Sequence, residues 1–258
     1  MKVKELTLEK KCEAVGETAM ILDKEGKSHE VYTFIYPAWI ITSIVVEDDL
    51  PICSASYLNG KLKGEWCYPE YQDNKELLRI RKKVWNRAKK SGIFDSDCIT
   101  GLINSKEDLA KNGEAGILER ENKLYELGER CAINEKEIWT PIYTAWVIAT
   151  VCEGKLIASL NYLESGEHRT EWRVSEFRGS KGLLAHRLRV IRRSILAGLI
   201  NPLGDYIFGL INPNNLASVK YFQRMGSDFD EVELHGQKWI QGRTHITKFL
   251  VEGGMEER

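Results

Sequence analysis

The sequence predicts an α/β (α+β) fold with two consecutive, similar domains, residues 1–130 and 131–258. Each domain is expected to hold a mixed, mainly antiparallel central sheet flanked by helices. Three observations predict this: an internal similarity of long period, short apolar runs bounded by turn residues, and a following stripe of apolar residues with helical spacing. The chain has 258 residues, 43% of them hydrophobic and 29% charged, which is typical of a globular protein with room for two domains.

The internal similarity consists of blocks that recur in the same order in the two halves. The paired blocks are Ile35–Ile41 with Ile142–Ile148, Ile52–Leu58 with Ile157–Leu163, Glu65–Trp66 with Glu171–Trp172, and Gly101–Asn104 with Gly209–Asn212. Two tryptophan positions and a Gly-Leu-Ile-Asn block coincide, which favours duplication over a chance likeness of strands. The period is far longer than a solenoid repeat, so we interpret it as domain duplication. The Lys/Glu-rich segment Ser105–Glu137 is the expected joint, with a loop at Asn112–Gly113.

In the second half, the first expected elements are three strands. Two apolar strands are predicted at Trp139–Cys152 and Leu156–Leu163, joined by a turn at Glu153–Gly154. A third strand is predicted at Thr170–Val174. A polar loop that contains glycine follows at Arg178–Gly182 and leads into a helix.

The helix after this loop carries a single apolar stripe at spacings of four, three and four residues. The stripe consists of Leu184, Leu188, Ile191 and Ile195. In the first half, Lys82 and Lys89 stand where the stripe has Leu188 and Ile195, so that helix is expected to pack with a rotated face.

The chain is expected to end with a strand, a helix and two further strands. The strand is predicted at Tyr206–Ile211. The helix is predicted at Asn215–Met225, and the following Gly226 is a typical helix end. The two closing strands are predicted at Glu231–Trp239 and Arg243–Val251.

The segment Asn212–Gly226 resembles the N-P-x-N-x-x-[AS]-x-x-x-Y-x-x-x-G-F segment of the GNAT N-acetyltransferase superfamily. The matching residues are Asn212, Pro213, Asn215, Ser218 and Gly226. The resemblance covers Ile142 to Leu250. It implies two tandem GNAT-like domains, and an enzyme that transfers an acyl group from acetyl-CoA or another acyl-CoA to an amine acceptor of unknown class.

The loop before the helix is the expected site for the pyrophosphate of CoA. A glycine-containing loop that opens a helix presents free backbone N–H groups to an anion, and the helix dipole adds positive potential. It is one residue longer between its glycines than the usual family loop. The expected cofactor-binding residues are Val174, Arg178, Gly179, Ser180, Lys181, Gly182, Leu183, Asn212 and Asn215. For Asn215, capping of the following helix is an equally good interpretation.

The first half lacks this loop chemistry. Residues Gln72–Glu76 stand in the same five places, with no glycine and with carboxylates at Asp73 and Glu76. A carboxylate beside a pyrophosphate repels it. We therefore expect CoA to bind only to the second half, and the first half to serve as a scaffold or as part of the acceptor cleft.

Two residues are candidates for proton transfer. Glu171, on the strand before the loop, is the candidate base, but Glu65 matches it in the first half, which favours an ion pair with an arginine. Tyr221 is the candidate acid for the CoA thiolate. The family's tyrosine position holds Phe222 here, and Tyr221 lies about 100° away on an ideal helix, so packing is the alternative role.

Two other functions remain open on the sequence. One is a non-catalytic binding protein of GNAT fold. The other is a transferase with another donor such as aminoacyl-tRNA, for which the arginines between Arg187 and Arg193 leave room. The chain lacks the coiled-coil arm that we would expect of the latter.

The overall charge and composition restrict the classes of binding partner and the expected location of the protein. The net charge of -1 gives no global attraction to nucleic acid. No apolar stretch has the length of a membrane span, and Met1–Lys11 lacks the apolar core of a signal peptide, so a cytoplasmic location is expected. Six scattered cysteines and five histidines show no metal-ligand spacing, so no metal is expected. The chain is expected to be a monomer or a homodimer.

Overall fold

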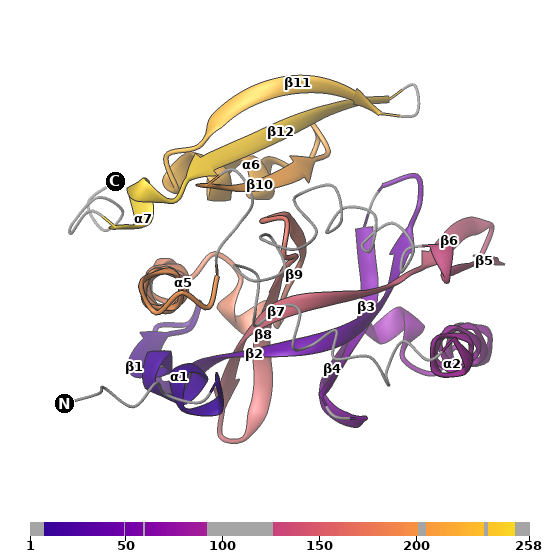
Figure 1. The fold of residues 1–258 in the computed structure, drawn as a ribbon, viewed down its shortest axis with the longest axis horizontal. Helices are drawn as coiled ribbons and strands as arrows, with labels where there is room; N and C mark the ends of the chain where they lie inside the picture. Colours follow the sequence, from indigo (N-terminus) through magenta and orange to yellow (C-terminus); the bar gives the residue numbers. More distant parts are fainter. Residues whose placement is uncertain are drawn as a thin grey trace. The chain divides into compact units, whose positions relative to one another are not determined.

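The computed structural model describes residues 8–48, 50–58, 60–91, 126–200, 205–234 and 237–250 (Figure 1). The fold is of the α+β class, with mainly antiparallel sheets and a few helices. The chain divides into two compact units, each formed from segments of both halves of the sequence. Unit 1 comprises Met1–Tyr36 and Trp146–Arg258, and unit 2 comprises Pro37–Ala145.

Unit 1 contains a curved antiparallel sheet, a long helix and a second, smaller sheet. Its elements are α1 (Leu8–Val15), β1 (Glu17–Leu22), the first part of β2 (Ser28–Val45), the last part of β7 (Ile142–Cys152), β8 (Lys155–Tyr162), β9 (His168–Arg173), the 3-10 turn η2 (Ser175–Phe177), α5 (Lys181–Leu196), β10 (Tyr206–Ile211), α6 (Leu216–Arg224), β11 (Asp228–Leu234), β12 (Gln237–His245) and α7 (Thr247–Leu250). Strands β7, β8 and β9 follow one another as antiparallel neighbours, and the smaller sheet has the order β10-β12-β11. At the tight turn between β7 and β8, Glu153 and Gly154 both have positive φ, which confirms the predicted hairpin.

Unit 2 contains antiparallel strands and one helix. Its elements are the last part of β2, β3 (Leu50–Leu58), β4 (Lys61–Cys67), the 3-10 turn η1 (Pro69–Tyr71), α2 (Lys75–Lys90), β5 (Glu129–Ile133), β6 (Lys136–Thr140) and the start of β7. Helix α2 buries a stripe that consists of Leu77, Ile80, Val84 and Ala88. The equivalent positions of α5 are buried too, namely Leu183, His186, Val190 and Ser194, so the two helices bury the same face and the expected rotation is wrong.

Matching elements in the two halves support the duplication inferred from the sequence. Helices α2 and α5 both have 16 residues and both follow a 3-10 turn. Asn74 caps α2 by accepting a hydrogen bond from Leu77 N, and Ser180 caps α5 by accepting one from Leu183 N. The strand registers shift at matching places too, after Ser43 in one half and after Thr150 in the other.

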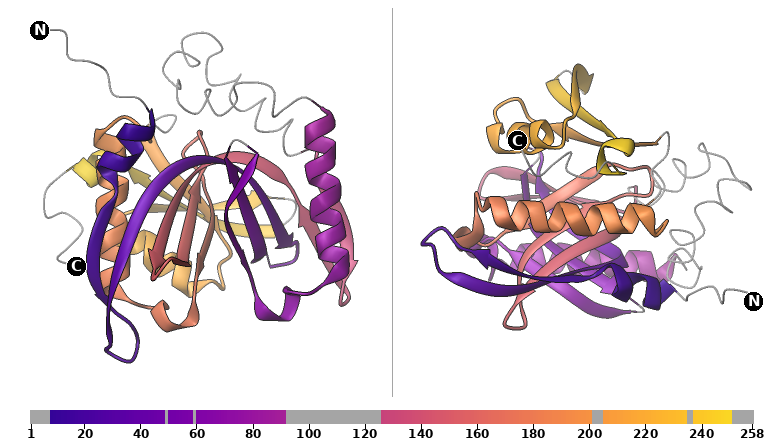
Figure 2. Two further views of the ribbon diagram at one scale, coloured as in Figure 1. Left: turned by 90° about the horizontal axis from the view of Figure 1, so that it is seen from below. Right: turned by 90° about the vertical axis from the view of Figure 1, so that its left-hand side faces the viewer.

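The two halves exchange hairpins. In unit 1, β1 and the first part of β2 pack beside α5, which comes from the second half of the sequence (Figure 2). In unit 2, β5 and β6 pack beside α2, which comes from the first half. Equivalent hydroxyl pairs tie each hairpin to its sheet. The Oγ1 atoms of Thr33 and Thr150 lie 2.8 Å apart in unit 1, and Ser43 Oγ lies 2.8 Å from Thr140 Oγ1 in unit 2.

One glutamate in each exchanged hairpin binds two cations of the helix that it covers. In unit 1, Arg189 Nε donates to Glu17 Oε1 at 2.8 Å, and Arg193 lies 3.6 Å from the other carboxylate oxygen. In unit 2, Glu129 pairs with Lys83 at 2.6 Å and with Arg87 at 2.5 Å. The same ion-pair pattern therefore fixes both hairpins.

The structure corrects several predicted boundaries. The expected joint Ser105–Glu137 includes β5 and the start of β6, and Trp139 lies in β6, because Pro141 separates β6 from β7. The predicted strand Glu231–Trp239 is wrong, since β11 ends at Leu234 and β12 begins at Gln237. The predicted strand Arg243–Val251 is also wrong in extent, because β12 ends at His245 and α7 follows. The apolar pattern therefore locates the turn at Glu153–Gly154 but misses the ends of β11 and β12.

Part of the prediction falls outside the described residues, namely the loop at Asn112–Gly113 and the block Gly101–Asn104. The compact units differ from the sequence copies because of the exchanged hairpins, and the copy boundary at residue 130 stays a prediction.

Among the described residues, no helix has the length and hydropathy that a membrane span needs.

Candidate functional site

The candidate site lies in unit 1, where β9 and β10 meet. The two strands run parallel and are joined by an isolated bridge between Glu167 and Phe208. Phe208 N donates to Gly166 O at 3.1 Å. Beyond this bridge the larger sheet ends at β9 and the smaller sheet begins at β10. Among the described residues, no strand therefore pairs with the outer edge of β9 from Thr170 onward.

The loop between η2 and α5 has the conformation that an anion site requires. Gly179 has a φ of 80°, which side-chain-bearing residues rarely adopt. The amides of Leu183 and Leu184 are bound by Ser180, so the open amides of the first helical turn are those of Lys181 and Gly182. Positive potential at the helix start and two open N–H groups favour an anion there.

The β1–β2 hairpin covers one flank of this loop. Ser180 Oγ donates to Leu22 O at 3.1 Å, and Lys24 N donates to Glu176 O at 2.9 Å. A Cβ atom placed on Gly182 would lie 3.6 Å from Ile21 Cδ1, an ordinary contact. The loop is therefore held in shape from one side, while Gly179 and Gly182 stay exposed.

The other predicted cofactor residues have mixed positions. Arg178 and Lys181 are exposed beside the loop glycines, whereas Leu183 is buried in the core. Val174 N donates to Ile157 O at 2.9 Å and the side chain packs against the core under η2. The sequence placed these residues together because they are close along the chain. In the structure, Arg178 and Lys181 point to solvent, whereas Val174 and Leu183 pack inward.

The two asparagines serve as local caps. Asn212 Oδ1 accepts a hydrogen bond from Asn214 N at 2.9 Å, and Asn215 Oδ1 accepts one from Ser218 N at 3.2 Å. Asn215 is the N-cap of α6. The capping role that the sequence left open is therefore present for Asn215, and its role in binding a cofactor stays a prediction.

Tyr221 and Phe222 point to different surroundings, as their helical spacing predicts. Phe222 packs between two glycines, since a Cβ on Gly209 would lie 2.6 Å from its ring and a Cβ on Gly242 2.9 Å from it. Tyr221 is buried, and its hydroxyl oxygen lies 3.2 Å from that of Tyr162. Phe222 therefore fills the core between β10 and β12, and Tyr221 reaches the polar interior near β8.

The Phe222 packing gives a first test. We expect Gly209→Ala to lower the free energy of unfolding by about 1–3 kcal/mol, because the added methyl group overpacks the ring. Urea unfolding measures the loss. Phe222→Leu combined with Gly209→Ala should recover part of it, because the smaller side chain makes room. A Gly209→Ala protein as stable as the wild type would contradict this packing.

A buried polar cluster lies around Tyr221. We call it the Tyr-His-Arg cluster, and it consists of Tyr162, His168, Glu171, Arg187 and Tyr221. The His168 ring lies 5.5 Å from the ring of Tyr162 and 5.6 Å from that of Tyr221, centroid to centroid. Sequence reasoning named two members as catalytic candidates and missed the roles of Tyr162, His168 and Arg187.

Glu171 is held by two arginines. Arg187 Nη1 donates to Glu171 Oε1 at 2.8 Å, and Arg173 Nη2 donates to the same oxygen at 2.6 Å. Burial alone would raise the pKa of Glu171, but these guanidinium groups lower it to about 2. A general base works best when its pKa lies near the working pH. The geometry thus favours the ion-pair role, as does the equivalent pair Arg81–Glu65 at 2.7 Å.

Several polar atoms of this region have no partner among the described residues although they are buried. These atoms are Asn161 Oδ1, His168 Nε2, Arg187 Nε and Arg187 Nη2. The Nε and Nη2 atoms form one edge of the guanidinium group, the edge that binds two oxygens side by side. The side chain of Arg187 is only 2% exposed. An unpaired buried guanidinium edge suits an anionic or carbonyl oxygen.

The tyrosines and His168 keep their neutral forms. Burial raises the pKa of Tyr221 to about 12 and also raises that of Tyr162 well above its ordinary value. Burial lowers the pKa of His168 to about 4. Beside the ionised Glu171–Arg187 pair, the cluster therefore offers neutral O–H groups and the unpaired edge of the Arg187 guanidinium, which can stabilise negative charge on a bound group.

A second buried carboxylate, Glu167, directly precedes β9 and has a raised pKa. Burial raises the pKa of Glu167, although Arg169 Nη2 lies 3.0 Å from its Oε2. Glu167 forms the bridge to β10, and the bulge at Arg169 places it on the opposite strand face from Glu171. No sequence pattern indicates the raised pKa, because it arises from burial at the junction of two sheets.

The arginines of α5 bind carboxylates in the same unit. Arg187 pairs with Glu171, and Arg189 and Arg193 pair with Glu17. Glu17 is shared by two of these arginines and Glu171 also binds Arg173, so carboxylates balance part of the positive charge of this helix face. Among the described residues, no group of three or more His, Cys, Asp or Glu side chains is arranged to hold a metal ion.

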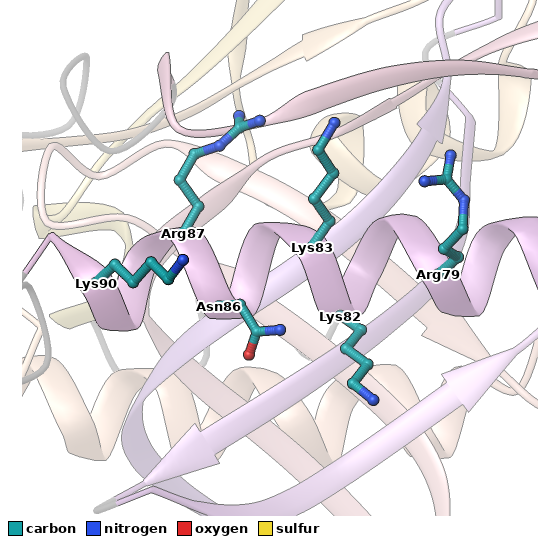
Figure 3. A pocket seen from close by; sticks show the side chains of 6 residues that line it. All are labelled: Arg79, Lys82, Lys83, Asn86, Arg87 and Lys90. Atoms are coloured by element: carbon teal, nitrogen blue, oxygen red, sulfur yellow. The ribbon is translucent and has the colours of Figure 1, made fainter.

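A second polar surface lies on α2 in unit 2. A shallow groove of about 450 Å³ follows one face of the helix (Figure 3). Its lining consists of Arg79, Lys82, Lys83, Asn86, Arg87 and Lys90. Arg79 pairs with Glu76, and Lys83 and Arg87 both pair with Glu129. Two carboxylates therefore pair with three of the five cations, and the groove keeps a net positive charge.

Comparisons with known proteins give little for this chain. No model of a protein family matches it, and no curated protein matches it. Among solved structures, the 1.55 Å crystal structure of an uncharacterized protein from Bacillus halodurans is similar, with 12% sequence identity and a TM-score of 0.33. The similarity covers 41% of this chain and 61% of that chain. A similarity this weak identifies no family and carries no statement about activity.

Proposed function

We propose that the chain is an acyl-CoA-dependent N-acyltransferase with two GNAT-like halves, and that unit 1 binds the CoA. The observation that carries this is the junction of β9 and β10, parallel strands joined by one bridge and followed by a glycine-containing helix start. An extended diamide such as the pantetheine arm of CoA can pair with the unpaired edge of β9 as an added strand does. The pyrophosphate then lies at the start of α5.

The start of α5 supplies the pyrophosphate contacts in this proposal. The open amides of Lys181 and Gly182 and the positive φ of Gly179 form the cradle, and Arg178 adds charge. In the first half, Glu76 occupies the place of Gly182 and binds Arg79 at 2.6 Å. One CoA per chain is therefore expected.

The proposed reaction is a direct attack of the amine on the thioester. The C–N bond forms, the carbonyl oxygen gains negative charge, and the C–S bond then breaks. We propose that Arg187 and Tyr221 stabilise the developing charge, with Glu171 positioning Arg187. Tyr221, whose pKa is raised to about 12, keeps its proton and can donate it to the thiolate. Glu167, with its raised pKa, is a better proton acceptor than Glu171 for an amine that approaches from the opposite face of the strand.

A second candidate function is acyl-CoA binding without catalysis. The observation that favours it is the repeat of the Glu171–Arg187 pair as Glu65–Arg81, in a half that lacks the loop chemistry. A pair that recurs without a cofactor site serves the fold. The arginines that would favour aminoacyl-tRNA as donor are bound to Glu17 and Glu171, so we do not propose that donor.

Isothermal titration of acetyl-CoA into the full chain tests the proposal. We expect one site per chain, and Gly182→Glu should weaken binding by about 100-fold, or about 2.7 kcal/mol, because the new carboxylate faces the pyrophosphate. The fold has room at Gly182, since a Cβ there makes only an ordinary contact. The matched control Glu76→Gly in the first half should leave the affinity and the stoichiometry unchanged.

The outcomes separate the candidates. If titration of acetyl-CoA and of free CoA releases no heat, both CoA-based functions are wrong. If Gly182→Glu binds CoA as tightly as the wild type, the CoA does not bind at the start of α5. Binding without release of free CoA in the presence of amine acceptors would favour the non-catalytic candidate.

A further inference from the structure

Two cysteines face each other in unit 2. Cys53 in β3 and Cys67 in β4 are direct partners in the antiparallel register. Tyr68 N donates to Ile52 O at 2.9 Å, so the neighbouring pair of residues is the hydrogen-bonded one. Cys53 and Cys67 are therefore a non-hydrogen-bonded pair, in which the Cα atoms lie about 4.5 Å apart. This separation is within the range of about 4.4–6.8 Å that disulfides span.

The two thiols interact and lie beside a buried cation. Both are free, with Cys53 buried and Cys67 partly exposed. A hydrogen bond from the Cys67 thiol and the charge of Arg81 outweigh burial and lower the pKa of Cys53 to about 7. The thiolate is the form of cysteine that attacks a disulfide. The pair thus shares one negative charge near neutral pH.

The other described cysteines lack these features. Burial raises the pKa of Cys12, Cys131 and Cys152. In their strands, Cys131 faces Ile138 and Cys152 faces Lys155. Neither faces another thiol.

The equivalent place in the second half holds no thiols. There Ala158 faces Arg173 in the same register, and Arg173 binds Glu171. The fold therefore does not require sulfur at this place. Two facing thiols are a property of the first half alone.

We infer that Cys53 and Cys67 form a reversible dithiol–disulfide site that reacts with low-molecular-weight disulfides such as glutathione disulfide. The partly exposed Cys67 attacks the glutathione disulfide as thiolate, after its proton moves along the S–H···S hydrogen bond to Cys53. One glutathione leaves as thiolate and takes the proton from Cys53, which becomes a thiolate. Cys53, as thiolate, then attacks the Cys67 sulfur of the mixed disulfide and displaces the second glutathione. Two protein thiols are oxidised to one disulfide, and one glutathione disulfide is reduced to two glutathione molecules.

This inference does not depend on acyl transfer, and the native full chain tests it. The protein is incubated with glutathione disulfide at neutral pH, alkylated and mapped by mass spectrometry without reduction. We expect one intramolecular disulfide joining Cys53 to Cys67, reversed by dithiothreitol. Cys53→Ser should instead carry a stable glutathione on Cys67, because the resolving thiol is gone. Cys131→Ser, the control, should form the disulfide at the wild-type rate.

Three results would overturn the inference. The first is a wild-type protein that carries only mixed disulfides. The second is a disulfide that joins other cysteines, including Cys98, which lies outside the described residues. The third is absence of the Cys53–Cys67 disulfide in native protein when the urea-unfolded chain forms it.

Discussion

Replacing Arg187 with methionine is expected to lower the free energy of unfolding by about 3–5 kcal/mol, because it leaves a buried carboxylate without its main partner. The Arg187 side chain is 2% exposed and the Glu171 side chain 17% exposed. Arg173 still reaches Glu171, but it cannot fill the volume that Arg187 occupies. Urea unfolding at pH 7 measures the loss.

The first half offers a matched control for Arg187. Arg81→Met breaks the equivalent pair, but Glu65 is 45% exposed and can be hydrated, so we expect a loss of about 1–2 kcal/mol. Combining Arg187→Met with Glu171→Gln should recover part of the larger loss, because no charge is then left buried. If Arg187→Met and Arg81→Met lose equal free energy of unfolding, the deeper burial of the Glu171–Arg187 pair does not add to its stabilising effect.

Acid is expected to destabilise the protein through His168, by about 3 kcal/mol between pH 6.5 and pH 4. Burial lowers the pKa of His168 from 6.5 to about 4 in the folded state. The unfolded chain therefore binds a proton as the pH falls through 6.5, while the folded chain does not. The stabilisation is complete above pH 6.5 and is lost as the pH falls through the folded pKa of about 4.

Glu171 extends the acid loss to lower pH. Its folded pKa of about 2 lies below the ordinary value of 4.5, so its stabilisation is present above pH 4.5 and is lost toward pH 2. Urea unfolding at a series of pH values separates the two groups. His168→Phe should flatten the curve between pH 6.5 and pH 4 while keeping the steeper loss below. A slope that persists in His168→Phe would assign it to His186, the other buried histidine with a lowered pKa.

The sequence predicted the local elements well and their pairing poorly. Apolar alternation and glycine placement located most strands and the loop before α5, whereas the equivalent caps at Asn74 and Ser180 were not predicted. Pairing of β1 with α5 could not be predicted, because an apolar strand face fits any apolar partner of similar size. Polar contacts such as the ion pairs of Glu17 and Glu129 specify the helix that each hairpin covers.

The candidate site was also predicted in part. The loop around Gly179 follows from its sequence, because glycine permits the positive φ. The Tyr-His-Arg cluster does not, since it gathers side chains from β8, β9, α5 and α6, which are far apart in the chain. The core role of Phe222 depends on Gly209 and Gly242, whose shared contact exists only in the folded sheet. The GNAT resemblance, the acyl-CoA cofactor and the cytoplasmic location stay predictions.

The exchanged hairpins bear on how the chain folds during synthesis. Glu17 and its partner Arg189 are 172 residues apart. At about 5–20 residues per second, the ribosome needs on the order of 10–30 s to make α5 after β1 has emerged. During that time the first hairpin has no helix to cover, and its apolar face, including Ile21 and Val31, is open to other nascent chains. Chaperone capture of this hairpin on the ribosome would therefore protect it until Lys181–Leu196 has been made.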